Sequence, residues 1–121
     1  MTITSDLMYR LLVQAVSDYA IYIVNRDGIV QNWNAGAERA KGYTAAEIVG
    51  RSFEVSYPEA DRAADLPRRN LEDAARTGRT SLEGWRRRRD GSAFWASITI
   101  DAIYAADGSF LGFAKVARDL T

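Results

Sequence analysis

Two Asp-Gly pairs in the C-terminal half of the chain constrain the fold more than any other feature. Asp90-Gly91 and Asp107-Gly108 are each flanked by runs rich in Trp, Phe, Ile and Val. An Asp-Gly pair between apolar runs is typical of a tight hairpin, because glycine adopts positive φ without steric cost and aspartate tolerates it. The sequence therefore predicts an antiparallel meander with strands at 81–89, 92–103 and 110–117.

The middle strand of this meander alternates between apolar and more polar residues. Phe94, Ala96, Ile98 and Ile100 share one face, and Trp95, Ser97, Thr99 and Asp101 share the other. Such alternation predicts one face in the core. The last strand is apolar on both faces, which indicates a central strand covered from both sides.

The charge balance gives no reason to expect nucleic acid or an acidic membrane surface as a partner. Lys plus Arg and Asp plus Glu number 16 each, so no net field gathers polyanions. No apolar run reaches the roughly 18 residues that a membrane-spanning helix needs. Asp6 and Arg10 interrupt the N-terminal apolar run, which argues against a signal peptide. We therefore expect no membrane insertion and a cytoplasmic location.

The chain has no cysteine and no histidine. Disulfides, Cys or His zinc sites, Cys or His nucleophiles and a histidine-ligated haem are thereby excluded. The sequence also lacks a Walker A motif and a Gly-rich phosphate fingerprint. We expect no metal site and no catalytic residues, so this segment is not predicted to be an enzyme.

The N-terminal segment, residues 1–17, is predicted to be a flanking helix with Thr4 or Ser5 as N-cap. Its apolar residues recur at spacings of three and four: Leu7, Met8, Leu11, Leu12, Ala15 and Val16. Two uses of this stripe are compatible with each other. The helix covers one face of the sheet, or it packs on a second copy of the chain.

Residues 18–121 are predicted to form one α+β domain. Asp27-Gly28 supplies a third turn, between strands at 20–25 and 29–33, which makes five strands. Short helices are expected between the two sets of strands. Their signals are Asn34 as an N-cap, a capping box of Thr44 with Glu47, Pro58 in a first turn, and a helix from Pro67 to Thr77.

Several short pieces of this sequence, taken together in order and spacing, resemble the PAS domain family of small sensor and interaction modules. The resemblance covers the chain from about Asp18 to the end. Its pieces are Asp27-Gly28, Trp33-Asn34, Gly36-Ala37-Glu38-Arg39, Gly42-Tyr43, Glu47-Ile48-Val49-Gly50-Arg51, Tyr57-Pro58-Glu59-Ala60-Asp61-Arg62, Gly84-Trp85-Arg86, Asp90-Gly91, Phe94-Trp95, Gly112-Phe113-Ala114-Lys115-Val116 and Arg118-Asp119-Leu120-Thr121.

The resemblance implies a five-stranded antiparallel sheet, with the last strand central, that encloses a ligand-sized hollow with the short helices on one face. It also implies signalling rather than catalysis. PAS modules of this type usually belong to bacterial sensor histidine kinases or cyclic-di-nucleotide enzymes, just before a helix that leads to the effector. The pattern from Arg118 to Thr121 normally precedes that helix. We therefore expect a domain of a larger two-component protein, in which a histidine kinase is the effector.

The interior of the hollow is predicted from alternation and from the resemblance. Its candidate ligand-pocket residues are Tyr22, Val24, Tyr43, Ile48, Phe53, Leu71, Phe94, Ala96, Ile98, Ile100, Ala114 and Val116. Each is either ordinary core or a ligand contact. PAS domains that form a flavin adduct need a cysteine, and haem-binding ones usually supply a histidine; the chain has neither. A noncovalent flavin or another small apolar ligand stays open, and so does a hollow that side chains fill.

The four consecutive arginines at 86–89 invite a nucleic-acid interpretation. In a neutral chain, a solvated edge strand that discourages strand addition is the preferred interpretation. Trp85 and Trp95 are expected to lie beside each other, either as a cross-strand pair or as part of a partner surface. The candidate dimer-interface residues are Leu7, Met8, Leu11, Leu12 and Trp95.

Two hypotheses about function follow. The first is a sensory module that forms a homodimer and relays a stimulus to a downstream effector domain. The second is a PAS module without ligand whose work is dimerisation and assembly.

Overall fold

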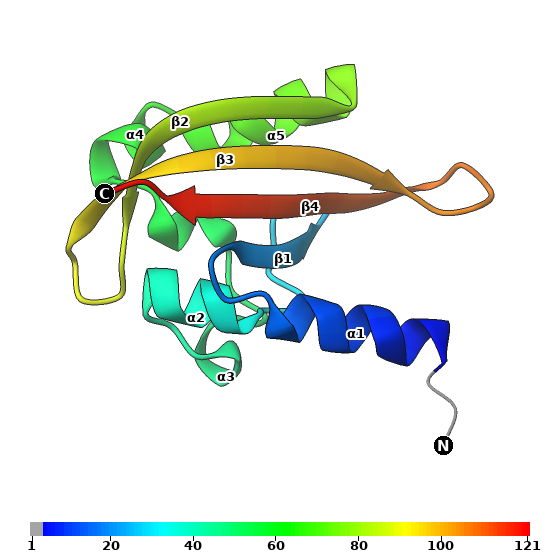
Figure 1. Ribbon diagram of the computed structural model, residues 1–121. Coiled ribbons are helices and arrows are strands. Elements are labelled where there is room, and N and C mark those ends of the chain that lie inside the picture. Colours follow the sequence, from blue (N-terminus) through cyan, green and yellow to red (C-terminus); the bar gives the residue numbers. More distant parts are fainter. Residues whose placement is uncertain (1–3) are drawn as a thin grey trace.

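The computed structural model describes residues 4–121 and shows an antiparallel sheet flanked by helices (Figure 1). Residues 1–3 of the predicted flanking segment lie outside the described residues. The elements, in chain order, are α1 (Ser5–Ala15), β1 (Ala20–Asn25), α2 (Ala35–Lys41), α3 (Ala45–Ile48), the 3-10 helix η1 (Phe53–Ser56), α4 (Glu59–Ala63), α5 (Leu66–Thr77), β2 (Arg79–Arg87), β3 (Ala93–Tyr104) and β4 (Phe110–Asp119). The predicted α+β class is confirmed.

The sheet has the strand order β1-β4-β3-β2, so the prediction that β4 is central is confirmed. The prediction that β4 is covered from both sides is wrong, because Ala114 and Val116 on its second face are half-buried and Ile23, opposite Ala114, is exposed. The two predicted turns of the meander are present, with Gly91 at φ 88° and Gly108 at φ 89°. Trp85 lies directly opposite Trp95 in the register of β2 and β3. Their rings meet edge to face, with centroids 5.2 Å apart. The predicted cross-strand pair is therefore confirmed.

The predicted fifth strand, at 29–33, is wrong. This segment makes only isolated bridges, from Val30 to Val24 and from Ile29 to Ser52. Pairing with β1 stops after Gln31, because the side-chain oxygen of Asn32 accepts the hydrogen bond of the Ile23 N–H at 2.7 Å. A side chain thus replaces the main-chain partner that a ladder would need, and the sheet has four strands.

The predicted inward orientation of Ala114 and Val116 on β4 is also wrong. Gly112, at φ 147°, accompanies a register shift between β3 and β4. Beyond this shift, Lys115 pairs with the buried Ile100 and Tyr22. Phe113, Lys115 and Ala117 are buried, whereas Ala114 and Val116 are half-buried. Because β4 carries apolar residues on both faces, alternation along its sequence does not show which face is buried.

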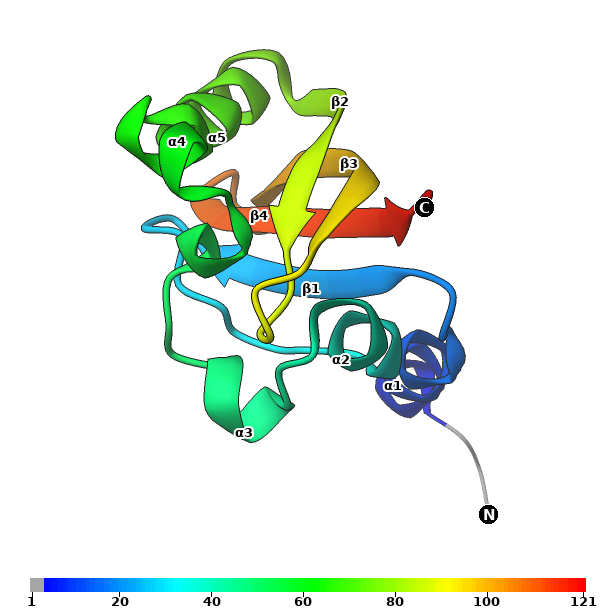
Figure 2. The same cartoon turned by 90° about the vertical axis from the view of Figure 1, so that its left-hand side faces the viewer.

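The helix signals are confirmed at nearly every end. Asn34 caps α2 and Gly42 ends it in the left-handed region. Thr44 and Glu47 form the capping box of α3, and Pro67 lies in the first turn of α5. The helix α5 packs on β2 and β3, while α2 packs on β1 (Figure 2).

The N-terminal helix α1 forms with Thr4 as its cap, as predicted. It packs on α2 and extends away from it past β1 (Figures 1 and 2). Met8, Leu11 and Leu12 are exposed. The interpretation in which this helix covers a face of the sheet is therefore wrong, because its apolar stripe faces solvent.

The side chain of Asn34 fixes the position of α1 relative to the domain. It is buried, and its oxygen accepts hydrogen bonds from the N–H groups of Ile21 and Ala37, both at 2.9 Å. Its amide group donates to the carbonyls of Val16 and Tyr19, both at 3.0 Å. One amide therefore joins the C-terminal end of α1, the start of β1 and the start of α2.

Candidate functional site

Most residues that were predicted to face the interior do so. Tyr22, Val24, Ile48, Phe53, Leu71, Phe94, Ala96, Ile98 and Ile100 are buried in one cluster, and the half-buried Tyr43 packs against it. Ala114 and Val116 are the exceptions described above. That any of these residues contacts a ligand stays a prediction.

The interior is largely filled by side chains. A cavity of about 10 Å³ lies among residues that include Tyr22, Lys41, Phe53 and Ser56. This is room for about one water molecule. A much larger open groove of about 500 Å³ lies outside it, with Leu71 among its lining residues. Phe53 is among the lining residues of both spaces.

Arg86 on β2 is buried, with 1% of its surface exposed. The prediction of a solvated edge is therefore wrong for this arginine. Arg86 pairs with the inward-facing Phe94, and its guanidinium carbon lies 3.8 Å from the centre of the Tyr57 ring. Nη1 donates to the carbonyl of Trp85 at 2.8 Å. Gly84 leaves space for it, since a Cβ atom there would lie 3.3 Å from Nη1.

Lys115 on β4 is equally buried, at 1% exposure. Its ammonium nitrogen lies over three aromatic rings, 4.4 Å from the centre of Phe53 and 5.5 Å from the centres of Tyr22 and Tyr57. The negative faces of aromatic rings attract a cation. These rings therefore compensate part of the cost of burying the ammonium group.

A third cation, Lys41, is also buried, with 2% of its surface exposed. It is the last residue of α2. Its ammonium donates to the hydroxyl oxygens of Tyr22 at 3.0 Å and of Ser56 at 3.2 Å. Lys41 and Lys115 are the only lysines in the sequence. Both are buried, whereas most arginines in the described part of the chain are exposed or half-buried.

We call Lys41, Arg86 and Lys115 the cation cluster. No aspartate or glutamate is buried among residues 4–121. Burial, with the charge of Arg86 in addition, lowers the pKa of Lys41 to about 7. Burial lowers the pKa of Lys115 well below its usual value, and the charges of Lys41 and Arg86 lower it further. Arginine keeps its charge in proteins, so the interior carries a positive charge without an acidic partner.

Sequence reasoning missed the cation cluster, although one signal for it was present. Phe113 and Ala117 lie two positions to either side of Lys115, and alternation along a strand places all three on one face. Their apolar character therefore indicates that Lys115 shares a buried face with them.

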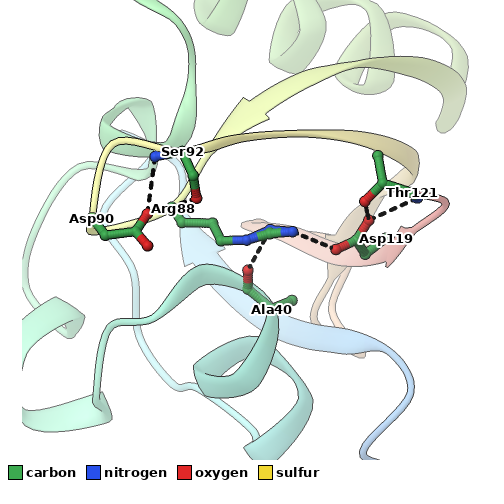
Figure 3. Close-up of polar contacts among 6 residues, drawn as sticks. All are labelled: Ala40, Arg88, Asp90, Ser92, Asp119 and Thr121. Atoms are coloured by element: carbon green, nitrogen blue, oxygen red, sulfur yellow. Dashed lines mark hydrogen bonds and ion pairs between the residues drawn. The ribbon is translucent and has the colours of Figure 1, made fainter.

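Arg88 ties the C-terminal end of the chain to the end of α2. Figure 3 shows Arg88 extending between Ala40 and Asp119. Its Nη2 lies 2.8 Å from the Asp119 carboxylate, and its Nη1 donates to the Ala40 carbonyl at 3.5 Å. The other oxygen of Asp119 accepts from the N–H of Thr121 at 2.9 Å. Next to Arg88, the N–H of Arg89 donates to the carbonyl of Lys41 at 2.8 Å.

Comparison with known proteins decides the family. A family model described as PAS fold matches residues 7–120. The chain belongs to the PAS family. The PAS domain of a Colwellia psychrerythraea protein has the same fold, with a TM-score of 0.85 and 21% identity over 97% of this chain and 98% of that one.

Two further matches extend the comparison. The PAS domain of a LuxR-family transcriptional regulator from Burkholderia thailandensis, solved in complex with ethanol, gives a TM-score of 0.76 at 21% identity over 93% of this chain and 96% of that one. In sequence, this PAS domain is 50% identical over 113 residues to two-component system protein A of Emericella nidulans. The match covers 93% of this chain and 16% of that relative.

The predicted PAS resemblance is thus confirmed, with a sheet of four strands in place of five. Within the described part of this PAS domain, none of the helices combines the length and the apolar character that crossing a membrane requires. Its cation cluster lies on the inner face of the sheet, against the rings of Tyr22 and Tyr57.

Proposed function

We propose that this PAS domain is a sensory and signal-relay module of a larger signalling protein. It couples a small-molecule or partner stimulus to an effector domain that follows Thr121, and the effector is a histidine kinase. The name of the relative at 50% identity, a two-component system protein, supports this proposal. The domain itself performs no catalysis, and its cytoplasmic location stays a prediction.

The observation that carries the proposal is the connection between the interior and the C-terminus. Lys41 belongs to the cation cluster through its side chain, and its carbonyl accepts the N–H of Arg89. The preceding carbonyl, of Ala40, accepts from Arg88, which pairs with Asp119. A displacement at the end of α2 therefore changes contacts that hold the last turn of the chain.

A relay requires that the stimulus favour one of two arrangements of the domain, since a ligand that binds both equally does not change their relative populations. The Arg88–Asp119 pair is suited to such a choice, because both side chains are about one-quarter exposed. Water screens a pair of this exposure less than a fully exposed one. Making or breaking the pair thus changes how firmly the C-terminal end is held against the domain.

The test is the substitution Arg88→Ala in the full-length protein that carries this domain, with autophosphorylation as the measurement. We expect the response to stimulus, or the basal rate, to change by roughly 5-fold or more, the usual range of coupling between sites. The matched control is Arg69→Ala, which removes an exposed arginine of α5. An Arg88→Ala protein with wild-type basal rate and wild-type response would contradict the relay.

A second candidate function is dimerisation and assembly without a ligand, as part of a homodimer. Two observations favour it: the filled interior, and the exposed apolar stripe of α1 with Met8, Leu11 and Leu12. Leu7 and Trp95, the other predicted interface residues, are half-buried, and the indole N–H of Trp95 donates to Glu83 at 2.9 Å. The stripe on α1 is therefore the stronger part of the proposed interface.

A further inference from the structure

Arg86 has two donors without an acceptor. Its Nε and Nη2 are buried and have no hydrogen-bond partner, whereas Nη1 reaches the carbonyl of Trp85. Nε and Nη2 form one edge of the planar guanidinium group. That edge presents two parallel N–H groups, which is the arrangement that binds both oxygens of a carboxylate.

The surroundings of this edge favour a negative charge. Arg86 and Lys115 face the same ring, that of Tyr57, at 3.8 and 5.5 Å from its centre. Lys115 and Lys41 both face the ring of Tyr22, at 5.5 and 5.0 Å. No carboxylate of the described chain is buried with them. Buried charges in proteins are normally paired, because an unpaired charge loses its hydration without compensation.

We propose that the cation cluster binds the carboxylate group of a small organic acid. The free edge of Arg86, which keeps its charge, holds both carboxylate oxygens, and the bound negative charge favours protonation of Lys115 and Lys41 beside it. This inference names the class of stimulus for the proposed sensory function and rests on that function for its role in signalling. Binding itself is measured on this chain alone.

The size of the interior limits the acid. The cavity beside Lys41 measures about 10 Å³ and is lined by neither Arg86 nor Lys115, so even the smallest carboxylate displaces a side chain when it binds at the free edge of Arg86. Phe53 is the side chain placed to move, because it lines both the interior cavity and the open groove of about 500 Å³ and the centre of its ring lies 4.4 Å from the Lys115 ammonium nitrogen. We therefore expect acids of one to three carbons to bind through this groove, with Phe53 displaced.

The probe for the test is sodium formate, titrated into the 121-residue chain at constant ionic strength with sodium gluconate as the compensating salt. Gluconate carries a carboxylate but is too large for the interior. The ¹³C resonances of the two lysine Cε groups report the cluster directly, because the chain has no other lysine. We expect both resonances to shift with formate, to saturate together and to give one binding constant.

Variants separate the cluster from nonspecific salt effects. Arg86→Met is expected to weaken formate binding at least tenfold, and the exposed Arg69→Met, with the same change in charge, to leave it unchanged. Without formate, Arg86→Met is expected to fold with at least wild-type thermal stability, because an apolar side chain replaces a buried charge that lacks partners. If Arg86→Met does not fold, Lys115→Met serves as the second variant, with the same loss of binding expected.

Three results would overturn the inference: no saturable shift with formate in the wild-type chain, equal formate affinity in Arg86→Met and wild type, or chloride binding as tightly as formate. The last would show an anion site that does not use the carboxylate-binding edge of Arg86. Formate binding without any change in effector output would leave the site standing and contradict the sensory function. If the effector output depends on Arg88 but formate does not bind, the relay stands and the carboxylate site is contradicted.

Discussion

Lys41 shows how a single buried amine alters the dependence of stability on pH. Its ammonium faces Tyr22 of β1 and Ser56 of η1, and the charges of Arg86 and Lys115 lie nearby on β2 and β4. Burial favours the neutral amine over the ammonium. The pKa of Lys41 is therefore lowered to about 7 in the folded state, from the ordinary lysine value of about 10.5.

We expect the free energy of unfolding to rise as the pH increases from about 7 to about 10. In that window the unfolded chain binds more protons than the folded one, so stability increases with pH, with a slope of up to ~1.4 kcal/mol per unit for one such group. The lowered pKa of Lys115 acts in the same direction. Burial raises the pKa of Tyr22 above 10.0, so this tyrosine opposes the trend only at higher pH.

Urea unfolding at pH 7.5 and at pH 9.5 measures this slope. Lys41→Met is expected to reduce it, because the substitution removes one of the two titrating amines, and Arg69→Met is expected to leave it unchanged. A wild-type stability that stays constant or falls between these pH values would show that the lysines are not buried as the structure places them.

At the scale of the elements, the sequence correctly predicts the helix ends, because these depend on contacts between residues close together in the chain. Asn34, Thr44 and Gly42 each act within one helical turn, and the helix ends that they predict are found. Pairing depends on residues far apart in the chain. The side chain of Asn32 ends the expected fifth strand by accepting the hydrogen bond of the Ile23 N–H, and no local sequence pattern predicts this contact.

The same distinction explains the candidate site. Alternation placed Phe94 to Ile100 on the correct face, because β3 has a clear difference between its faces. β4 lacks that difference, so alternation and the family resemblance predict Ala114 and Val116 in the interior, whereas Lys115 lies there. The charge of Arg86 predicts exposure to solvent, but its position opposite the inward-facing Phe94 turns it toward the interior.

The helix α1 allows a direct test of the proposed dimer. Leu12 is 62% exposed, so Leu12→Glu removes apolar contact area from the stripe without disturbing the core. We expect this substitution to convert a dimer into a monomer in sedimentation equilibrium, because a charge in an apolar interface is costly to desolvate.

The matched control is Arg10→Gln, on the same helix, which changes the net charge by the same amount and is expected to leave the dimer intact. An unchanged sedimentation mass for Leu12→Glu, or a wild-type chain that is already monomeric, would contradict dimerisation through α1.

At the scale of the whole molecule, the interior and the C-terminus are two ends of one chain of contacts. The cation cluster includes the last residue of α2, the carbonyls at the end of α2 hold Arg88 and Arg89, and Arg88 holds Asp119. Each link is a hydrogen bond or an ion pair between named atoms. Energetic coupling along this series of contacts requires that both sites bias one element.

The measurement that tests the account most directly is amide hydrogen exchange at Leu120, whose N–H donates to the carbonyl of Trp95 at 2.9 Å. Exchange rates in wild type, Lys41→Met, Arg88→Ala and the double variant give the opening free energies of a double-mutant cycle. We expect a coupling between the two positions of about 0.5–2 kcal/mol. Effects that add to within ~0.3 kcal/mol would show that the interior and the C-terminus are independent, and would contradict the relay.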